Sequence, residues 1–256
     1  MAKGSRGGRR GGGATSVLSI GGGSNIPTNA VNLSDKDADQ LRQQQDSMYD
    51  ANTTSAVKMY ISDTNFDQQG HSLSQTMNYL LDNGVDLNNV DLNSVNKQFG
   101  LRLTANDVAS MQYTNSYMEI ATHTIGKDVN LVRGAHDDIL RNVYGIQDYS
   151  KMTAQQLSSM LVGQKFSTTS YMSTSYDVNK NPFLSSSSGV SGGREVVFNI
   201  KAGANTKMLF GAKKQSEIIL DKGTNFKITG VRYSGKTATP RNRGAMPQLI
   251  IDIETI

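Results

Sequence analysis

Several residue types are scarce or missing in this chain of 256 residues. It has no cysteine, no tryptophan and only four prolines. Without cysteine the chain can form no disulfide bond and can offer no thiol nucleophile. No apolar run approaches the roughly 20 residues that a membrane-spanning helix needs, so we expect no membrane partner. The basic N-terminal residues precede no apolar segment, so we expect no secretory signal peptide.

Net charge is also missing from most of the chain. Residues 1–13 carry Lys3, Arg6, Arg9 and Arg10 and no acidic residue, and removing these four from the 26 basic residues leaves 22 against 22 acidic ones. The whole net charge of +4 therefore lies in this segment. A basic surface that covers the protein and binds nucleic acid is not predicted.

The N-terminal segment is rich in glycine, with GGG at 11–13 and again at 21–23. Such a composition cannot bury enough apolar surface to offset the entropy lost on ordering, so residues 1–33 are predicted to form a flexible tail. Its Arg/Gly segment RGGRRGGG can contact phosphates or RNA. It can equally serve as a spacer or attachment arm that needs no such partner.

Helices are predicted mainly in residues 34–126. A hydroxyl residue with an acid or amide three positions later, which is a helix-capping pattern, occurs at Ser34–Asp37, Thr104–Asp107 and Thr153–Gln156. The segment SLSQTMNYLLDNG places its apolar residues on one face and ends at Gly84. We expect four helices from these signals.

Strands are predicted mainly in residues 127–256. The segment DVNLVRG is a short strand, and later strands are expected in REVVFNI, TKMLFG, SEIILD, NFKITGVRY and PQLIIDIETI. A helical part followed by a strand-rich part predicts an α+β protein. We expect one domain over residues 34–256.

Three polar features lie at the ends of predicted strands. Arg133 follows an apolar strand in NLVRGAH, and its guanidinium suits either a structural ion pair or an anion such as phosphate. Ser173 lies in the hydroxyl-rich segment YMSTS, which is also compatible with an exposed edge strand. Gln215 and Glu217 lie where a polar loop enters an apolar strand, and in an extended chain they would point to the same face.

In this order the three features resemble the Arg–Ser–Glu class of mono-ADP-ribosyltransferases. The chain is similar to the single-domain clostridial Rho-inactivating exoenzymes, which carry Gln–x–Glu where arginine-modifying relatives carry Glu–x–Glu. YTNSY (113–117) resembles the family's Tyr–Thr helix, and VVFNIKAGANTKMLFGAKKQSEIIL resembles its final catalytic hairpin. The family's asparagine late in that helix corresponds to Ala121 here. The resemblance implies an α+β ADP-ribosyltransferase-like fold, with a helical N-terminal subdomain and a two-sheet β-sandwich around an NAD cleft.

The resemblance also implies roles for four residues, with NAD as the substrate. Glu217 would bind the ribose and stabilise its oxocarbenium-like charge, as carboxylates do in glycoside hydrolysis. Ser173 would bind NAD and hold the rotamer of Glu217. Arg133 would bind the pyrophosphate, and the backbone of Gly134 would meet the nicotinamide amide.

Four further residues complete the expected site. Phe183 and Arg194 resemble the aromatic residue and the arginine of the loop that covers the nicotinamide and the phosphates. Gln215 would orient the acceptor, because an amide suits an Asn, Gln or Thr side chain better than a guanidinium. Phe210 is either a hydrophobic contact to the target protein or a core aromatic at a strand end.

The expected partners are NAD and a target protein, with nucleic acid as the second choice of acceptor. His71, His123 and His136 have no cysteines or suitably spaced carboxylates beside them, so no metal is expected. We expect a monomer that acts in the cytoplasm of the producing or infected cell, or that is delivered by another route. Two alternatives stay open: a phage-type structural protein with an inactive transferase fold, and a transferase directed to RNA or nucleoprotein by the tail.

Overall fold

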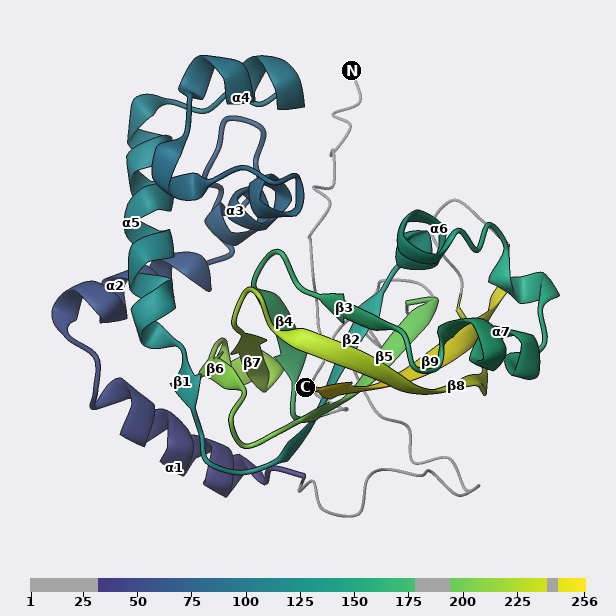
Figure 1. Cartoon of the computed structure of the whole chain (residues 1–256). Helices are drawn as coiled ribbons and strands as arrows, with labels where there is room; N and C mark the ends of the chain where they lie inside the picture. The colour runs from purple at the N-terminus through teal and green to yellow at the C-terminus, as the bar shows by residue number, and fades with distance from the viewer. Residues whose placement is uncertain (1–31, 178–193, 239–243) are drawn as a thin grey trace, which may run out of the picture. The chain divides into compact units, whose positions relative to one another are not determined.

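The described part of the chain forms two compact units. The computed structural model describes residues 32–177, 194–238 and 244–256 (Figure 1). One unit comprises residues 48–122, and the other combines residues 32–47 with the described residues from 123 onward. The first helix, α1 (Asp35–Asp46), therefore belongs to the unit that contains the strands.

Helices build the unit of residues 48–122. Its elements are α2 (Ala51–Tyr60), α3 (Leu73–Asp82), the 3-10 turn η1 (Leu87–Asn89), α4 (Leu92–Phe99) and α5 (Ala105–Ala121). The predicted cap of α5 is confirmed, since Thr104 and Asp107 satisfy each other's backbone amides in a capping box. Helix α3 begins in the same way, with Ser72 and Gln75. Both helix starts therefore have partners for backbone amides that would otherwise lack them.

Helices α2 and α5 pack against each other in this unit. Tyr60 of α2 and Met111 and Met118 of α5 are at most 2% exposed, as is Met77 of α3. The Tyr49 hydroxyl donates to the carbonyl of Ala121 (2.8 Å). The apolar faces of these helices therefore bury a core of their own.

A nine-stranded sheet organises the second unit. Its strands are β1 (His123–Thr124), β2 (Val129–Ala135), β3 (Lys165–Ser167), β4 (Met172–Ser175), β5 (Val196–Ala202), β6 (Lys207–Phe210), β7 (Glu217–Leu220), β8 (Asn225–Ala238) and β9 (Met246–Thr255). They lie in the order β1-β6-β7-β4-β2-β5-β9-β8-β3. Neighbouring strands run antiparallel, apart from the parallel pair β5 and β9. The five late strands expected from the sequence are all present.

Two groups of strands meet at the contact between β2 and β4. These strands pair only at Val132 and Ser175, whereas β2 pairs with β5 along all of its 7 residues. One hydrophobic core contains residues of both groups, including Phe210 and Ile218 on one side of the join and Phe198 on the other. The two expected sheets are thus joined into one continuous sheet by the single pair of Val132 and Ser175.

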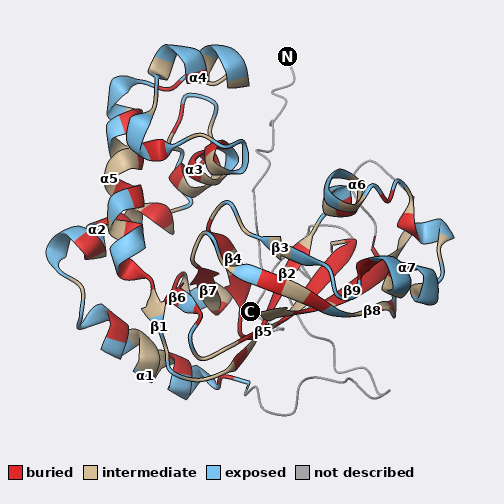
Figure 2. Cartoon of the chain, viewed as in Figure 1, coloured by how far each residue is buried: buried red, intermediate tan, exposed pale blue. Residues whose placement is uncertain are grey.

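Short helices lie along this sheet. Besides α1 they are α6 (Asp138–Tyr144) and α7 (Ala154–Leu161), with 3-10 turns η2 (Tyr149–Lys151) and η4 (Lys213–Gln215). The predicted caps of α1 and α7 are confirmed, at Ser34 and at Thr153. Figure 1 shows α1 beside β6 and α7 beside β8, and these pairs are in contact. Figure 2 shows that buried residues follow the central strands while α6 and α7 expose their outer faces.

Candidate active site

Three neighbouring strands carry the arginine, the serine and the glutamate of the expected site. Arg133 lies on β2, Ser173 on β4 and Glu217 at the start of β7, and β4 lies between the other two strands. Ser175 pairs with Val132 on one side and with Glu217 on the other. Residues that lie far apart in the sequence are therefore brought together by strand pairing.

Arg133 links β2 to β4 through its side chain. Its Nη1 donates to the carbonyl oxygen of Ser173 at 2.9 Å. Val132 pairs with Ser175, and from the next position along β2 the Arg133 side chain reaches the backbone of Ser173. The next residue, Gly134, is buried. The guanidinium thus lies at the single pair that joins the two groups of strands.

The hydroxyls of β4 hold the following strand and loop in place. Thr174 donates to the carbonyl of Ile218 (2.7 Å), and Ser175 donates to the carbonyl of Gln215 (3.0 Å). Side-chain alternation places Ser173 on the same face as Ser175 and Glu217. Our sequence interpretation named Ser173 and missed Ser175, which lies directly opposite Glu217. The two-residue alternation along YMSTS was the signal that could have identified it.

The carboxylate of Glu217 is held by the loop that precedes it. The backbone amide of Ala212 donates to Oε2 of Glu217 at 2.8 Å. A Cβ atom on Gly211 would lie 2.3 Å from the same oxygen, well inside van der Waals contact. Any side chain at position 211 would therefore force the Glu217 carboxylate out of the place that the loop gives it.

The conformation of the loop corrects one expectation. Gln215 and Glu217 were expected in an extended chain, and this is wrong: Gln215 ends the 3-10 turn η4, and Ser216 has left-handed backbone angles (φ 48°, ψ 38°). Ser216 is fully buried, and its carbonyl accepts from the amide of Tyr176 at 3.1 Å. The bend is stabilised by this hydrogen bond and by the one that the Ser175 hydroxyl donates to the Gln215 carbonyl. Gln215 is half-buried and lies two residues before Glu217, outside the strand.

Phe210 is buried rather than presented at the surface. It is the last residue of β6, is 4% exposed and belongs to the hydrophobic core. Its backbone amide donates to Oε1 of Gln45 (2.7 Å), and the guanidinium carbon of Arg42 lies 5.3 Å from its ring centroid. Of the two interpretations left open by the sequence, the core aromatic describes this environment.

Arg194 lies near the end of β2 that carries Gly134. The strand pair Ala135–Val196 brings it there, and its Nη1 contacts Nε2 of His136. Nδ1 of the same imidazole lies 3.0 Å from the carboxylate of Glu195. Burial lowers the pKa of Arg194, against the opposing effect of the Glu195 and Asp138 charges. A phosphate at Arg194 would have to compete with His136.

The remaining expectations concern residue 183, metals and membranes. Phe183 lies outside the described residues. Across residues 32–177, 194–238 and 244–256, no group of three or more His, Cys, Asp or Glu side chains could hold a metal ion. No helix in that same part of the chain is long and apolar enough to cross a bilayer.

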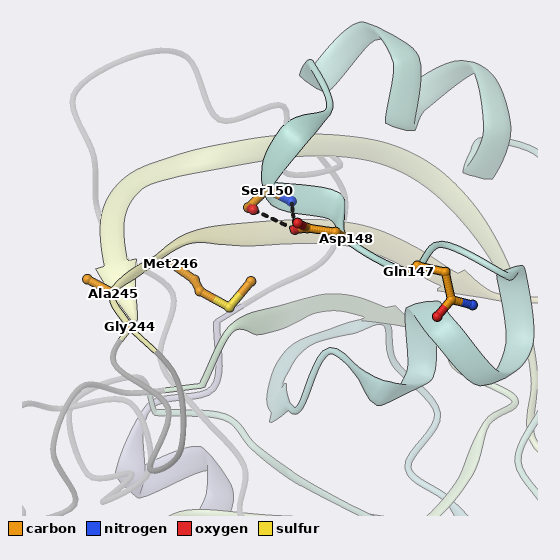
Figure 3. Close-up of a pocket in the computed structure, with 6 residues that line it drawn as sticks. All are labelled: Gln147, Asp148, Ser150, Gly244, Ala245 and Met246. Carbon is orange, nitrogen blue, oxygen red and sulfur yellow. Dashed lines mark hydrogen bonds between the residues drawn. The ribbon is translucent and has the colours of Figure 1, made fainter.

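The structure also has a surface pocket of about 390 Å³ (Figure 3). It is lined by Gln147, Asp148, Ser150, Gly244, Ala245 and Met246. Hydrogen bonds from the Ser150 side chain and the Lys151 ammonium lower the pKa of Asp148. None of the expected site residues lines this pocket.

A family model matches most of the chain. Residues 74–255 match the model described as ADP-ribosyltransferase exoenzyme. No curated protein matches the chain. The matched segment contains all the expected site residues, from Arg133 to Glu217.

Solved structures with low sequence identity share the fold. A protein from S. aureus, solved with NAD, is 16% identical with a TM-score of 0.55, and the match covers 90% of this chain and 99% of that one. An ADP-ribosyltransferase from Clostridium botulinum, solved in a triclinic crystal form, is 17% identical with a TM-score of 0.53, at 88% and 98% coverage. The enzymatic component of the Clostridium botulinum C2-toxin is 16% identical with a TM-score of 0.54. There the match covers 86% of this chain but only 47% of the toxin component, so this chain spans about half of that protein.

Proposed function

The chain belongs to the ADP-ribosyltransferase exoenzyme family and is an NAD-dependent ADP-ribosyltransferase, and we propose that it modifies an Asn, Gln or Thr side chain of a target protein. The observation that carries this proposal is the loop of residues 211–217, which holds Glu217 by a backbone amide and places Gln215 on the preceding turn. One short loop, held in place by hydrogen bonds, thus carries both the Glu217 carboxylate and the Gln215 amide. NAD as the substrate is supported by the S. aureus relative that was solved with it.

The reaction needs stabilisation of a positive ribose. The electrons of the bond between ribose C1 and nicotinamide leave with the nicotinamide, which departs neutral, and the ribose becomes oxocarbenium-like. In our proposal the fixed negative charge of Glu217 faces this cation, and the amide of Ala212 keeps the carboxylate in place before reaction. The acceptor then forms a bond to C1 and loses a proton, while water takes the same place in NAD hydrolysis.

Arg133, Gly134 and Ser173 bind the substrate in this proposal. The Arg133 guanidinium is held at β4 by the Ser173 carbonyl, and the fork geometry of a guanidinium suits the oxygens of a pyrophosphate. Gly134 has no side chain to block the nicotinamide amide from its backbone. The Ser173 hydroxyl, on the face of Glu217, orients the carboxylate. Immobilised at both ends, NAD presents C1 to the acceptor.

In this proposal Glu217 stabilises the ribose cation and Gln215 selects the acceptor. A side-chain amide both donates and accepts, so it can pair with the amide of Asn or Gln or with the hydroxyl of Thr. A carboxylate at the same place would favour a guanidinium acceptor instead. The loop position of Gln215, outside the strand that carries Glu217, leaves it free to approach a partner without moving the carboxylate.

Labelled NAD tests the proposal directly. The full chain and its Glu217→Gln variant are incubated with cell lysates and NAD labelled in the adenosine part, and modified residues are identified by mass spectrometry. We expect label on Asn, Gln or Thr, and a loss of both labelling and nicotinamide release of more than about one hundredfold in Glu217→Gln. Label on Arg would overturn the acceptor class, and label on RNA would favour the nucleoprotein alternative. Equal nicotinamide release by both proteins would overturn the role of Glu217.

A further inference from the structure

One face of helix α1 contacts the strand end and loop that lead to Glu217. Asp39, Arg42 and Gln45 follow at intervals of three residues, which places them side by side along the helix. Each of them bonds to β6 or to the loop after it. The helix belongs to the same compact unit as the loop. No residue of α1 was expected in the site from the sequence.

Gln45 fixes α1 to the end of β6. Its Nε2 donates to the carbonyl of Met208 (3.1 Å), and its Oε1 accepts from the amide of Phe210 (2.7 Å). The side-chain amide thus bonds to the backbone much as a neighbouring strand would. Gln45 is only 2% exposed, so these bonds are shielded from water. The position of the helix relative to residue 210 is therefore well defined.

Arg42 bonds to the next residue of the chain, Gly211. Its Nη1 donates to the Gly211 carbonyl at 2.5 Å, while its guanidinium lies over the Phe210 ring. The same peptide unit that presents this carbonyl carries the amide of Ala212, which donates to Glu217. One peptide group therefore accepts from the cation at its oxygen and donates to the carboxylate through its nitrogen.

We propose that Arg42 is a positioning residue for Glu217, acting through the peptide unit that joins Gly211 to Ala212. A cation at the carbonyl polarises the peptide group and strengthens its N–H as a donor, since hydrogen bonds in a chain reinforce one another. A stronger donor holds the carboxylate more firmly and favours its charged form. The inference rests on the proposed role of Glu217 as the charge that faces the ribose.

The other donors of Arg42 support a role beyond helix docking. Its Nε and Nη2 are buried and have no hydrogen-bond partner among the described residues. A guanidinium placed only for stability would be expected to satisfy such donors, because unpaired buried donors are costly. The neighbouring pair Lys213–Asp39 (2.8 Å) is exposed, so solvent screens it and it polarises the loop little. Of these two cations, Arg42 is therefore the one that acts on the peptide group.

Substitution of Arg42 tests the inference. Arg42→Met keeps a long apolar stem over Phe210 but removes the charge and the donor, and Arg42→Lys keeps the charge. We expect Arg42→Met to lower kcat for NAD hydrolysis about tenfold with KM for NAD changed by less than about threefold, since the affected interaction acts on the transition state. The acid limb of its pH–rate profile should move to higher pH, because a carboxylate that loses a nearby cation is protonated more easily. Arg42→Lys should recover most of kcat.

A matched control and a second measurement keep the test decisive. Arg102→Met removes the same charge at an exposed position of the other unit and should leave kcat and the pH profile unchanged. Hydrogen exchange of the Ala212 amide, followed by NMR, should speed up at least about tenfold in Arg42→Met, whether or not NAD is hydrolysed. Unchanged exchange and an unchanged acid limb, or equal impairment by Arg42→Lys and Arg42→Met, would overturn the inference. Faster exchange in a protein that never hydrolyses NAD would instead overturn the proposed function alone.

Discussion

At the scale of single residues, Gly211 sets how closely the loop approaches the carboxylate. A methyl group there would meet Oε2 of Glu217 at 2.3 Å and its Cδ at 2.7 Å, so Gly211→Ala must displace the side chain or open the loop. We expect NAD hydrolysis, measured as nicotinamide release, to fall about one hundredfold, as when a preorganised charge is misplaced. Gly244→Ala is the control, because no atom of the described residues lies within 4 Å of its added methyl group. Near-normal hydrolysis by Gly211→Ala would show that the loop does not hold Glu217 in the reactive state.

Substitution of Gln215 should separate NAD hydrolysis from the transfer of ADP-ribose to protein. If it only orients the acceptor, Gln215→Ala should hydrolyse NAD at a rate within about threefold of the parent and transfer ADP-ribose to protein at least about tenfold more slowly. Nicotinamide release and protein labelling, measured in the same reaction, report the two rates. Equal losses in both would mean that the amide supports bond cleavage itself, and the division of labour would be wrong.

Asp67 should make the stability of the helical unit depend on pH. Burial raises the pKa of this carboxyl, but hydrogen bonds from the backbone amides of His71 and Gln69 and from the His71 ring outweigh burial and lower it overall. A carboxyl whose pKa is lower in the folded state stabilises the protein above its unfolded pKa of about 4, and this stabilisation is lost as the pH falls. We therefore expect the free energy of unfolding, measured with urea, to decline from about pH 5 downward. The Asp67→Asn variant should show a flatter decline.

The residues of the site differ in how far sequence reveals them. Arg133, Ser173 and Glu217 were predicted because their residue types and order form a pattern, and the structure places them on neighbouring strands. Gly211 and Arg42 carry no such pattern, since their importance comes from a carbonyl and an amide that only the folded loop brings together. The left-handed Ser216 was missed for a related reason, because that conformation is rare for residues other than glycine.

At the scale of elements, the start of α5 offers a test of capping. The Thr104 hydroxyl accepts from the Asp107 amide, and the Asp107 carboxylate accepts from the Thr104 amide. Thr104→Ala should lower the free energy of unfolding by about 1 kcal/mol, whereas Thr104→Ser should change it little because serine caps equally well. Thermal unfolding followed by circular dichroism measures both. Equal stability of the two variants would show that the cap contributes nothing here.

Several elements with strong local signals were predicted, but helix α4 was missed although Asp91 caps its start and Gly100 ends it. Helices α3, α5 and α7 begin with capping boxes that can be read directly. Helix α2 was missed because Thr53, Thr54 and Val57 disfavour helix locally, and it is stabilised by packing on α5. Helix α6, which has 7 residues, was also missed. Strand β3 has 3 residues and exists through its pairing with β8.

At the scale of the whole molecule, strand order was beyond sequence reasoning. Strand β9 is the last in the chain, yet it lies between β5 and β8 and runs parallel to β5. The middle of β9, residues 249–251, is apolar and buried, which indicates that both faces of the strand are covered but does not identify its neighbours. Likewise, nothing local marks Val132 and Ser175 as the pair that joins the two groups of strands. These features follow from contacts between distant segments, which set the topology without leaving a local pattern.

The boundary of the N-terminal segment gives a prediction for the molecule as a whole. Leu33 is 6% exposed and belongs to the core of the strand unit, and the side chain of Asn32 accepts from Asn130 (3.1 Å). Deleting residues 1–31 keeps both contacts, so we expect NAD hydrolysis within about twofold of the full chain and an unchanged unfolding midpoint. Deleting residues 1–33 removes a buried leucine as well and should lower stability by about 1.5–3 kcal/mol. If the shorter deletion already abolished hydrolysis, the Gly/Arg-rich segment would be part of the catalytic protein; if it changed only which proteins are labelled, the segment would direct the enzyme to its target.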